Sequence, residues 1–292
     1  MRIIRYVTEN GKPQLAAVTD EDLVYDLPQT DFIRFVKDTR ALHLSPTQWV
    51  SNWIQVRSPI ELSLSELTLT TPVDAPEVWA CGVTYRRSLE ARNYEATGGQ
   101  ASTLTCYDKV YDAERPELFF KLTAARTIGP GEPVFLRSDS RWQVPEPELG
   151  LVLDAEGSIV GYTVGNDMSC RDIEGENPLY LPQAKIWKYS CAIGPAIRLS
   201  DSVPDPYAFS IHCRIVRDGE TVFEEEASVG QLKRKLEELA GWLCRDNVVF
   251  DGTVLLTGTC IVPPNEFTLL PGDRIDIAIP GIGVLSNPVS GA

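Results

Sequence analysis

The sequence predicts a β-rich α+β fold, and three observations support this prediction. From Val78 onward, short apolar segments are separated by frequent Gly and Pro, which is typical of strands joined by turns. Residues at helical spacing are confined to a few segments. The chain has 292 residues, of which 43% are hydrophobic, so it can bury a large core as one large domain or two smaller ones.

Residues 1–75 are expected to form a small N-terminal α+β domain. Residues 2–27 read as two strands joined by a turn at Asn10-Gly11, which is a strong hairpin signal. A short helix is expected to follow, and then an acidic, proline-containing linker at residues 69–77. The predicted domains are therefore 1–75 and 76–292.

The second predicted domain consists mainly of strands. One long helix is expected at residues 228–246, because Val229, Leu232, Leu236, Leu239 and Leu243 recur at helical spacing. The expected strands are 78–83, 117–122, 134–138, 149–154, 158–167, 191–199, 209–216, 252–259 and 273–279. Many strands and few helices indicate a roll or barrel.

Composition excludes several classes of function. The formal net charge is −14, which argues against nucleic acid and anionic membrane surfaces as partners. No stretch approaches the roughly 18 apolar residues of a membrane span. The cysteines are scattered without a Cys-x-x-Cys pair, and the N-terminus lacks the apolar segment of a signal peptide, so a cytoplasmic protein is predicted. Since His43 and His212 have no catalytic partner nearby in sequence, both are interpreted as structural.

Three acidic residues form the main candidate site. Glu146 and Glu148 would share one face of an extended strand, where their charges repel. Asp167 ends the next predicted strand, and a turn near residues 154–158 would bring it opposite the pair. Three carboxylates without histidine or thiol favour Mg²⁺, or else Mn²⁺ or Ca²⁺, over zinc. The alternative interpretation is three solvated charges on a strand face.

Other polar residues lie at the ends of predicted strands, where side chains and backbone can reach a ligand. Lys185 precedes a buried-looking strand and could act as a base, an acid or a carboxylate anchor, since burial readily shifts a lysine pKa. The further candidates are Tyr85, Arg86 and Ser88 after strand 78–83, Glu117 and Lys121 in strand 117–122, and Thr257, Gly258 and Thr259 at the end of strand 252–259. Taken singly, each also has a purely structural interpretation.

In this order, the segments resemble the fumarylacetoacetate hydrolase family, from about Trp79 to Pro288. The matching motifs are "PEPELGLVL" for its Glu-x-Glu, "GNDMSCRD" for its Asn-Asp-x-Ser-x-Arg-Asp, "AKIW" for its Lys-x-Phe, "LLTGTC" for its Thr-Gly-Thr-Pro and "GDRIDIAIPGIGVLSNPV" for its C-terminal segment. The resemblance implies a mixed β-roll catalytic domain, a divalent metal on Glu146, Glu148 and Asp167, and a homodimer or homotetramer.

Departures from the family pattern affect the expected reaction. The family's hydrolases carry Tyr-x-x-His in the first motif, and here Ser88 stands in place of that histidine. A serine without a histidine beside it is a poor general base. The proline of the Thr-Gly-Thr-Pro motif is replaced by Cys260. Segments 107–121 and 176–187 instead resemble the 2-keto-3-deoxy-pentonate dehydratases of the family, which implies catalytic roles for Glu117 and Lys185.

This resemblance implies Mg²⁺-dependent dehydration of a 2-oxo acid substrate, a 2-keto-3-deoxypentonate, to 2,5-dioxopentanoate through an enolate that the metal stabilises. Glu117 and Lys185 would share the roles of base and acid, in an order that the sequence leaves open. Tyr85, Arg86, Ser88 and the Thr257–Thr259 segment would contact the substrate.

Three alternatives remain open at this stage. The first is an acylpyruvate or fumarylpyruvate hydrolase that compensates for the missing histidine. The second is a 2-oxo acid decarboxylase or isomerase, which needs the same metal and enolate. The third is a non-catalytic family member that binds a keto acid or supports an assembly.

Overall fold

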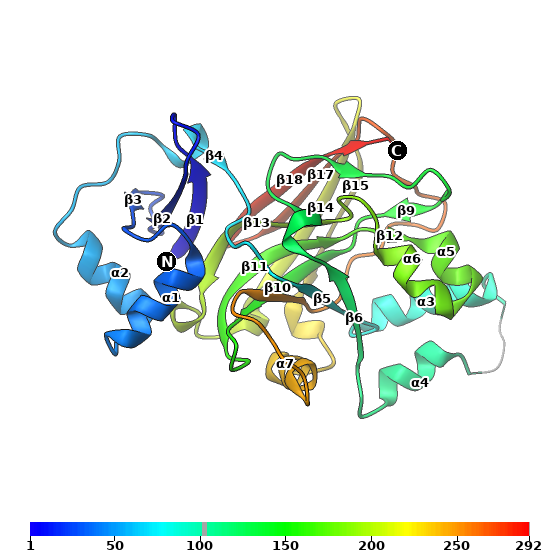
Figure 1. The fold of residues 1–292 in the computed structure, drawn as a ribbon. Helices are drawn as coiled ribbons and strands as arrows, with labels where there is room; N and C mark the ends of the chain where they lie inside the picture. The colour runs from blue at the N-terminus through cyan, green and yellow to red at the C-terminus, as the bar shows by residue number, and fades with distance from the viewer. Residues whose placement is uncertain (101–103, 292) are drawn as a thin grey trace.

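The computed structural model describes residues 1–100 and 104–291, and its strands form two main sheets (Figure 1). The order of the larger sheet is β3 (Val24–Asp26), β2 (Pro13–Val18), β1 (Arg2–Val7), β13 (Cys191–Leu199), β11 (Ile159–Asp167), β10 (Pro147–Leu153), β16 (Thr253–Leu256), β5 (Val78–Gly82) and β6 (Glu117–Leu122). In addition, β4 (Thr68–Leu69) pairs with β1 and β7 (Thr127–Ile128) pairs with β13.

The second main sheet lies against one face of the first. Its order is β15 (Glu220–Ser228), β14 (Ser210–Arg217), β17 (Arg274–Ile279), β18 (Gly283–Ser290) and β8 (Val134–Phe135), and a separate pair is formed by β9 (Gln143–Val144) and β12 (Ser169–Cys170). Leu149, Leu151 and Val164 of the larger sheet share a core with Ile211 and Ile275 of the second. The predicted β-rich α+β fold is therefore confirmed, with a layered sheet core as in a roll.

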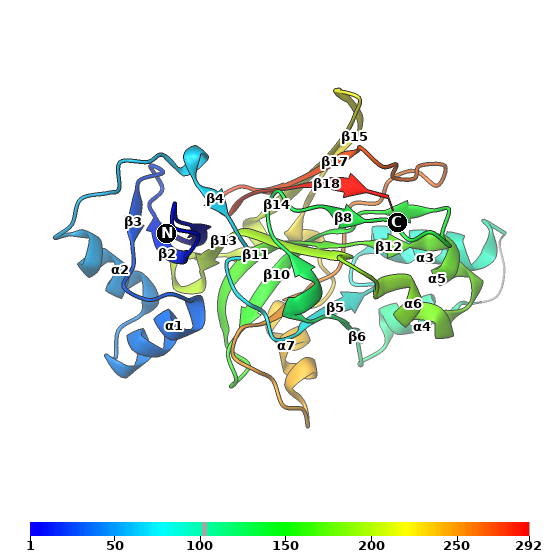
Figure 2. The ribbon, with the colours of Figure 1, turned by 45° about the horizontal axis from the view of Figure 1, so that its top comes forward.

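The helices lie around these sheets. They are α1 (Phe32–Ala41), α2 (Pro46–Ile54), α3 (Arg86–Thr97), α4 (Cys106–Asp112), α5 (Arg171–Glu176), α6 (Leu181–Lys185) and α7 (Leu236–Cys244). In both views α1 and α2 lie at one end of the molecule with the N-terminal strands, and α3 to α6 gather at the other (Figure 2). Within residues 1–100 and 104–291, no helix has the length and apolar character needed to span a bilayer.

The N-terminal strands join the larger sheet. The predicted hairpin is present, since β1 and β2 pair from Arg2 opposite Val18 to Val7 opposite Pro13. On its other side β1 pairs with β13, so the sheet runs across the predicted boundary at residue 75. Phe32 and Phe35 of α1 pack on one face of this sheet. The division into domains 1–75 and 76–292 stays a prediction, because the hydrogen-bonded ladder continues through it.

The β10–β11 hairpin positions the acidic motif, as the sequence predicts. Its ladder places Glu148 opposite Gly165 and Pro147 opposite Asn166. Asp154 closes the turn by accepting hydrogen bonds from the backbone N–H groups of Glu156 at 3.0 Å and Ser158 at 2.8 Å. On its other side, β10 pairs with β16 only from Gly150 onward. Pro147, which has no N–H to donate, therefore lies beyond that ladder.

The long helix expected at residues 228–246 is wrong in extent. The structure has a 3₁₀ turn at Val229–Gln231, a non-helical connector over residues 232–235, and then α7 from Leu236 to Cys244. Within the connector, the Lys233 N–H donates to the Thr84 carbonyl at 3.0 Å, and the Arg234 side chain donates to main-chain carbonyls near α4. These tertiary hydrogen bonds override the helical periodicity.

Candidate active site

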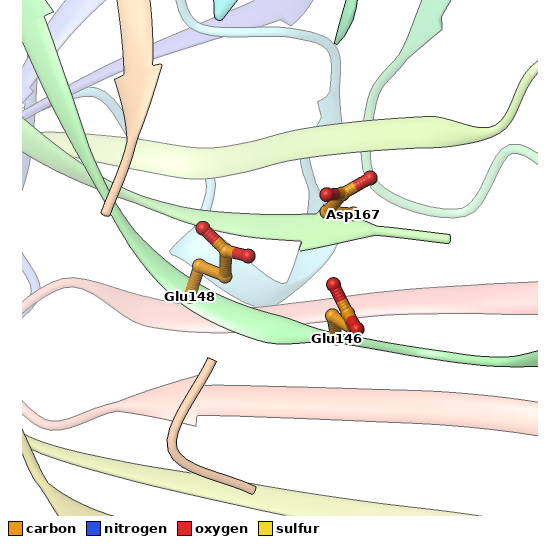
Figure 3. A group of neighbouring side chains, drawn as sticks. All are labelled: Glu146, Glu148 and Asp167. Atoms are coloured by element: carbon orange, nitrogen blue, oxygen red, sulfur yellow. The ribbon is translucent and has the colours of Figure 1, made fainter. Parts of the chain in front are cut away.

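The three predicted carboxylates converge (Figure 3). Glu146 directly precedes β10 and Glu148 is its second residue. Asp167 ends β11, where its N–H donates to the Glu146 carbonyl at 3.0 Å. One oxygen from each carboxylate lies within 4.8 Å of the others, and all three side chains are buried. The alternative of three solvated charges on a strand face is therefore wrong.

The two glutamates differ in their electrostatic surroundings. Burial alone would raise the pKa of Glu146, but Lys185, Arg171 and Arg92 together hold that pKa well below its usual range. The pKa of Glu148 is raised well above its usual range by burial and by the charges of Asp167 and Glu146. A divalent cation between the three groups would remove this repulsion.

Two buried lysines contact the carboxylates. Lys185, at the end of α6, places Nζ 2.5 Å from Glu146 Oε2, 3.1 Å from Asp167 Oδ2 and 2.6 Å from Ser169 Oγ. Lys121, on β6, places Nζ 2.5 Å from Asp167 Oδ1 and donates to the Met168 carbonyl at 2.9 Å. Both side chains are almost completely inaccessible to solvent. Each ammonium group thus contacts a different oxygen of the Asp167 carboxylate.

Two arginines and two further glutamates complete the cluster of charges. Arg171, at the start of α5, lies 2.9 Å from Glu146 Oε1 and also pairs with Glu95. Arg92, on α3, pairs with Glu174 and Glu95 and lies 3.8 Å from Glu146 Oε1. These four side chains are buried. Helices α3 and α5 therefore add to the positive charge of Lys185 on α6, which together keep Glu146 ionised.

The cluster as a whole carries an excess of negative charge. Its carboxylates belong to Glu95, Glu117, Glu146, Glu148, Asp167 and Glu174, and its basic groups to Arg92, Lys121, Arg171 and Lys185. With every group ionised, these ten side chains carry two net negative charges. A buried excess of this size is costly unless a cation compensates it. The oxygen-only donor set and this excess both fit one divalent hard cation.

Glu117 lies beside the carboxylate cluster at the start of β6. Its carboxylate occupies the space that a side chain at Gly82 would need, because a Cβ built there would lie 1.8 Å from Glu117 Oε2. Burial raises the pKa of Glu117, with Arg92 and Lys185 opposing the shift. Gly82 also lines a small cavity of about 10 Å³, roughly one water in size. Its walls include Ser88, Arg92, Glu146, Arg171, Lys185 and Thr259.

The Thr-Gly-Thr segment packs against the acidic motif through its backbone. The Gly258 N–H donates to Glu148 Oε2 at 2.6 Å. Thr257 Oγ1 donates to the Leu149 carbonyl at 2.9 Å, and Thr259 Oγ1 donates to the Ile261 carbonyl at 2.9 Å. Of the two threonines, Thr259 lines the cavity, whereas the hydroxyl of Thr257 is used within the sheet. Gly258 is thus a direct partner of a candidate metal ligand.

Gly258→Ala is expected to reduce both stability and activity. Gly258 has φ +96°, and a Cβ built there would lie 2.0 Å from Thr84 Oγ1. The strained backbone alone costs about 1–3 kcal/mol of unfolding free energy, and relief of the clash would displace the N–H from Glu148. Thermal unfolding of the metal-free protein measures the first effect, and divalent-metal titration measures the second. An alanine variant with unchanged stability and metal affinity would contradict the assigned geometry.

The first motif contributes unevenly to the site. Ser88 lines the cavity, and its Oγ donates to the Tyr85 carbonyl at 2.8 Å at the start of α3. Tyr85 is buried in the hydrophobic core, and burial raises its pKa. Arg86 has a side chain that is 78% exposed and pairs with Glu90 at 3.5 Å. The structure therefore brings Ser88 to the site, places Tyr85 behind it and leaves Arg86 on the surface.

Several residues of the site were not identified from the sequence. They are Arg92, Glu95, Ser169, Arg171 and Glu174. Ser169 and Arg171 belong to the quoted "GNDMSCRD" motif, so a signal existed for both. Lys121 was a candidate from the sequence, and the structure adds its contact with Asp167. Arg92, Glu95 and Glu174 lie on helices, and their meeting depends on the packing of α3 against α5. The interpretation of His43 and His212 as structural fits the structure, since neither lines the cavity.

Comparison with known proteins gives the family. The protein-family model described as "Fumarylacetoacetate (FAA) hydrolase C-terminal" matches residues 89–290. The chain belongs to the fumarylacetoacetate hydrolase family. A Haloferax volcanii protein named probable 2-keto-3-deoxyxylonate dehydratase is 50% identical over 221 residues, which is 76% of this chain and 74% of that protein.

Two further comparisons point to the same subgroup of the fumarylacetoacetate hydrolase family. The 2-dehydro-3-deoxy-D-arabinonate dehydratase of Saccharolobus solfataricus is 47% identical over 226 residues, 77% of this chain and 76% of that protein. A solved structure of 2-keto-3-deoxy-D-arabinonate dehydratase complexed with magnesium and 2,5-dioxopentanoate has a TM-score of 0.85 and 37% identity, covering 100% of this chain and 99% of that chain. The resemblance seen in the sequence motifs, and the fold expected from it, are confirmed.

Proposed function

We propose that this protein is a Mg²⁺-dependent dehydratase that converts a 2-keto-3-deoxypentonate to 2,5-dioxopentanoate. The arrangement of three side chains around the carboxylates carries the proposal. Lys185 contacts two of the three converging carboxylates, and Glu117 lies beside them. Ser88 lines the cavity at the position where the family's hydrolases have a histidine. The relatives that are 47–50% identical are named as dehydratases of this substrate class, which supports the same reaction here.

Glu146, Glu148 and Asp167 would hold the metal. A bound divalent cation supplies Lewis-acid polarisation of the 2-oxo group, which acidifies the protons on C3. Mg²⁺ suits the three carboxylates best, with Mn²⁺ or Ca²⁺ as possible substitutes. Lys121 would hold Asp167 in place, and Arg171 would keep Glu146 ionised, while the site is loaded.

The contacts of Lys185 suggest which group is the acid and which is the base. Its ammonium donates to Glu146, Asp167 and Ser169, which uses all three N–H bonds of a protonated amine. A protonated amine can give a proton and cannot accept one, so we assign Lys185 as the acid and Glu117 as the base. The raised pKa of Glu117 brings this carboxylate closer to the basicity needed to take a proton from carbon.

In the proposed reaction, Glu117 removes a C3 proton and Lys185 gives a proton to the departing C4 hydroxyl, which leaves as water. A double bond forms between C3 and C4, and tautomerisation through C5 gives the aldehyde of 2,5-dioxopentanoate. Ser88 and Thr259 line the cavity and are candidates to hold the substrate carboxylate or its hydroxyls. Each of the two proton transfers is expected to contribute about 10²–10⁴-fold to the rate.

The proposal is tested by offering the purified protein, with Mg²⁺, 2-keto-3-deoxypentonates and acylpyruvates side by side. We expect an aldehyde product from the pentonates and no cleavage of the acylpyruvates. Turnover of acylpyruvates alone would identify a hydrolase, and release of CO₂ would identify a decarboxylase. Metal binding without any turnover would identify a non-catalytic member.

We further propose that the protein is a cytoplasmic homodimer or homotetramer. The oligomer is what the family resemblance implies, and the free, mostly buried cysteine thiols support a reducing compartment. Sedimentation equilibrium on the purified chain tests the first point, with a monomer at micromolar concentration as the contradicting result.

A further inference from the structure

The connector between the 3₁₀ turn and α7, residues 232–235, makes unusually many contacts with segments that lead into the site. Arg234 is 8% exposed, although it lies in a connector between helices. Its guanidinium donates to the carbonyls of Glu114 at 2.9 Å, Ala113 at 2.6 Å and Val110 at 3.3 Å. A fourth contact, to Glu238 at 2.7 Å, fixes Arg234 to α7. This set of contacts fills most of the donor capacity of one guanidinium.

These carbonyls belong to the last turn of α4 and the residues that follow it. Carbonyls at the end of a helix have no intrahelical partner, and a positive group there satisfies them. Lys233 adds to the same contact, because its Nζ donates to the Tyr111 carbonyl at 2.6 Å and pairs with Asp112. The end of α4 is thus held by two consecutive basic residues of the connector.

Helix α4 covers the outer side of Glu117. A second pocket, of about 300 Å³, is lined by Tyr107 and Val110 of α4 together with Pro116 and Glu117. On the opposite side, the Glu117 carboxylate fills the space beside Gly82. Gly82 lines the small cavity of about 10 Å³ next to the three carboxylates, which we call the inner cavity. Glu117 therefore separates the inner cavity from a space bounded by α4. Helix α4 therefore forms part of the wall around the outer side of this carboxylate.

The connector reaches a second part of the site through its backbone. The Lys233 N–H donates to the Thr84 carbonyl at 3.0 Å, and Thr84 Oγ1 donates to the Thr257 carbonyl at 2.6 Å. Thr84 lies directly before Tyr85 and α3, and Thr257 precedes Gly258, the backbone partner of Glu148. One short segment is therefore bonded to the residues that precede α3, which carries Ser88, and to those that precede β6, which begins with Glu117. Thr84 continues this connection to the Thr-Gly-Thr turn.

We propose that Lys233 and Arg234 are positioning residues of the active site, which hold α4 over Glu117, while the backbone of Lys233 fixes Thr84, the residue that bonds the Thr-Gly-Thr turn. This rests on the proposed dehydratase function for its kinetic consequences only. Neither residue touches the three carboxylates or lines the inner cavity, so both act through the groups that they hold. Their role also accounts for the interruption of the helical pattern at residues 232–235.

The first test measures the anchoring without substrate. Amide hydrogen exchange over residues 107–117 is compared in the wild type, Arg234→Met, Arg234→Lys and Lys235→Met. We expect exchange to be at least about tenfold faster in Arg234→Met and intermediate in Arg234→Lys, since a lysine replaces the fork with one point donor. Lys235, an exposed neighbour, is the matched control and should behave as the wild type. Unchanged exchange in both Arg234 variants would overturn the inference, whatever reaction the protein catalyses.

The second test separates a positioning role from general stability. Arg234→Met should lower kcat on the order of 10²-fold, because misplacing a catalytic group by about 1 Å has that effect. The Mg²⁺ dissociation constant of the metal-free protein should change less than about twofold, since Arg234 has no contact with the carboxylates. In a Glu117→Gln background, Arg234→Met should cause less than about a twofold further loss, because both changes act on the same group. A further loss in kcat on the order of 10²-fold in that background would overturn the positioning role. A wild-type protein without dehydratase activity would instead contradict the proposed function.

Discussion

Glu146→Gln and Glu148→Gln are expected to abolish metal-dependent turnover alike, yet to change the metal-free protein in opposite directions. Each removes one of three converging carboxylates, so each should weaken Mg²⁺ binding and reduce kcat/KM by about 10³-fold or more, since Lewis-acid assistance contributes several kcal/mol. Both glutamates are buried. They differ in the groups around them, since Glu146 is paired with Lys185 and Arg171, whereas Glu148 accepts a hydrogen bond from the Gly258 N–H.

In the metal-free protein, Glu146→Gln should be destabilising. Lys185 and Arg171 both contact the Glu146 carboxylate, at 2.5 and 2.9 Å. Removing one partner of a buried ion pair leaves an uncompensated charge and costs about 3–5 kcal/mol of unfolding free energy. Among the described residues Glu148 forms no ion pair, and its charge is opposed by Glu146 and Asp167. Glu148→Gln should therefore leave the metal-free protein as stable as the wild type or more stable.

The pH dependence of stability gives an independent check. Because the folded-state pKa of Glu148 is raised above its ordinary value of 4.5, the folded protein keeps a proton that the unfolded chain releases. Stability of the metal-free protein should then fall as pH rises above about 4.5, by at most about 1.4 kcal/mol per pH unit for one group. Glu117 adds to this slope with the same sign. Glu146, whose pKa is lowered, is ionised in both states above about pH 5 and adds no slope there.

Denaturant unfolding in EDTA from pH 5 to 8 measures these effects. We expect the smallest slope in Glu148→Gln and a lesser reduction in Glu146→Gln, because the lost charge of Glu146 only helps to raise the pKa of Glu148 and Glu117. Glu226→Gln, at an exposed glutamate on β15, should behave as the wild type. Excess Mg²⁺ should stabilise the wild type and neither site variant. Equal destabilisation by both site variants in EDTA would contradict the charge distribution described here.

The acidic motif could be predicted from the sequence because its geometry is local. Glu146 and Glu148 share a strand face, and a five-residue turn fixes the register that brings Asp167 opposite them. The period of two along a strand and the length of a hairpin turn are both readable from the chain. The N-terminal hairpin could be predicted for the same reason, because its turn is marked locally by Asn10-Gly11.

The rest of the site depends on contacts between distant segments, which periodicity does not encode. Arg92 reaches Glu146 and Glu174 only because α3 packs against α5, and Lys121 reaches Asp167 from a strand 46 residues earlier in the chain. The helix expected at 228–246 was wrong for the same reason. Its apolar spacing is genuine, but hydrogen bonds from Lys233 and Arg234 to remote carbonyls are incompatible with a continuous helix there.

Lys185→Met is expected to reduce turnover by about 10²–10⁴-fold without loss of metal binding. The sequence placed Lys185 ahead of a strand, and the structure adds that its ammonium contacts two candidate metal ligands, Glu146 and Asp167. Removing a positive charge from this position leaves the carboxylates more negative. The affinity for Mg²⁺ should therefore stay equal to the wild-type value or increase.

Isotope exchange can distinguish which of Glu117 and Lys185 is the base and which is the acid. If Glu117 removes the C3 proton and Lys185 protonates the leaving hydroxyl, Lys185→Met should still exchange the C3 protons of a 2-keto-3-deoxypentonate with D₂O while forming no aldehyde. Glu117→Gln should lose both the exchange and the aldehyde, although the three candidate metal ligands remain. NMR of the recovered substrate measures the exchange. Loss of exchange in Lys185→Met together with its retention in Glu117→Gln would reverse the two assignments, because the group that takes a proton from carbon is the one whose removal stops exchange.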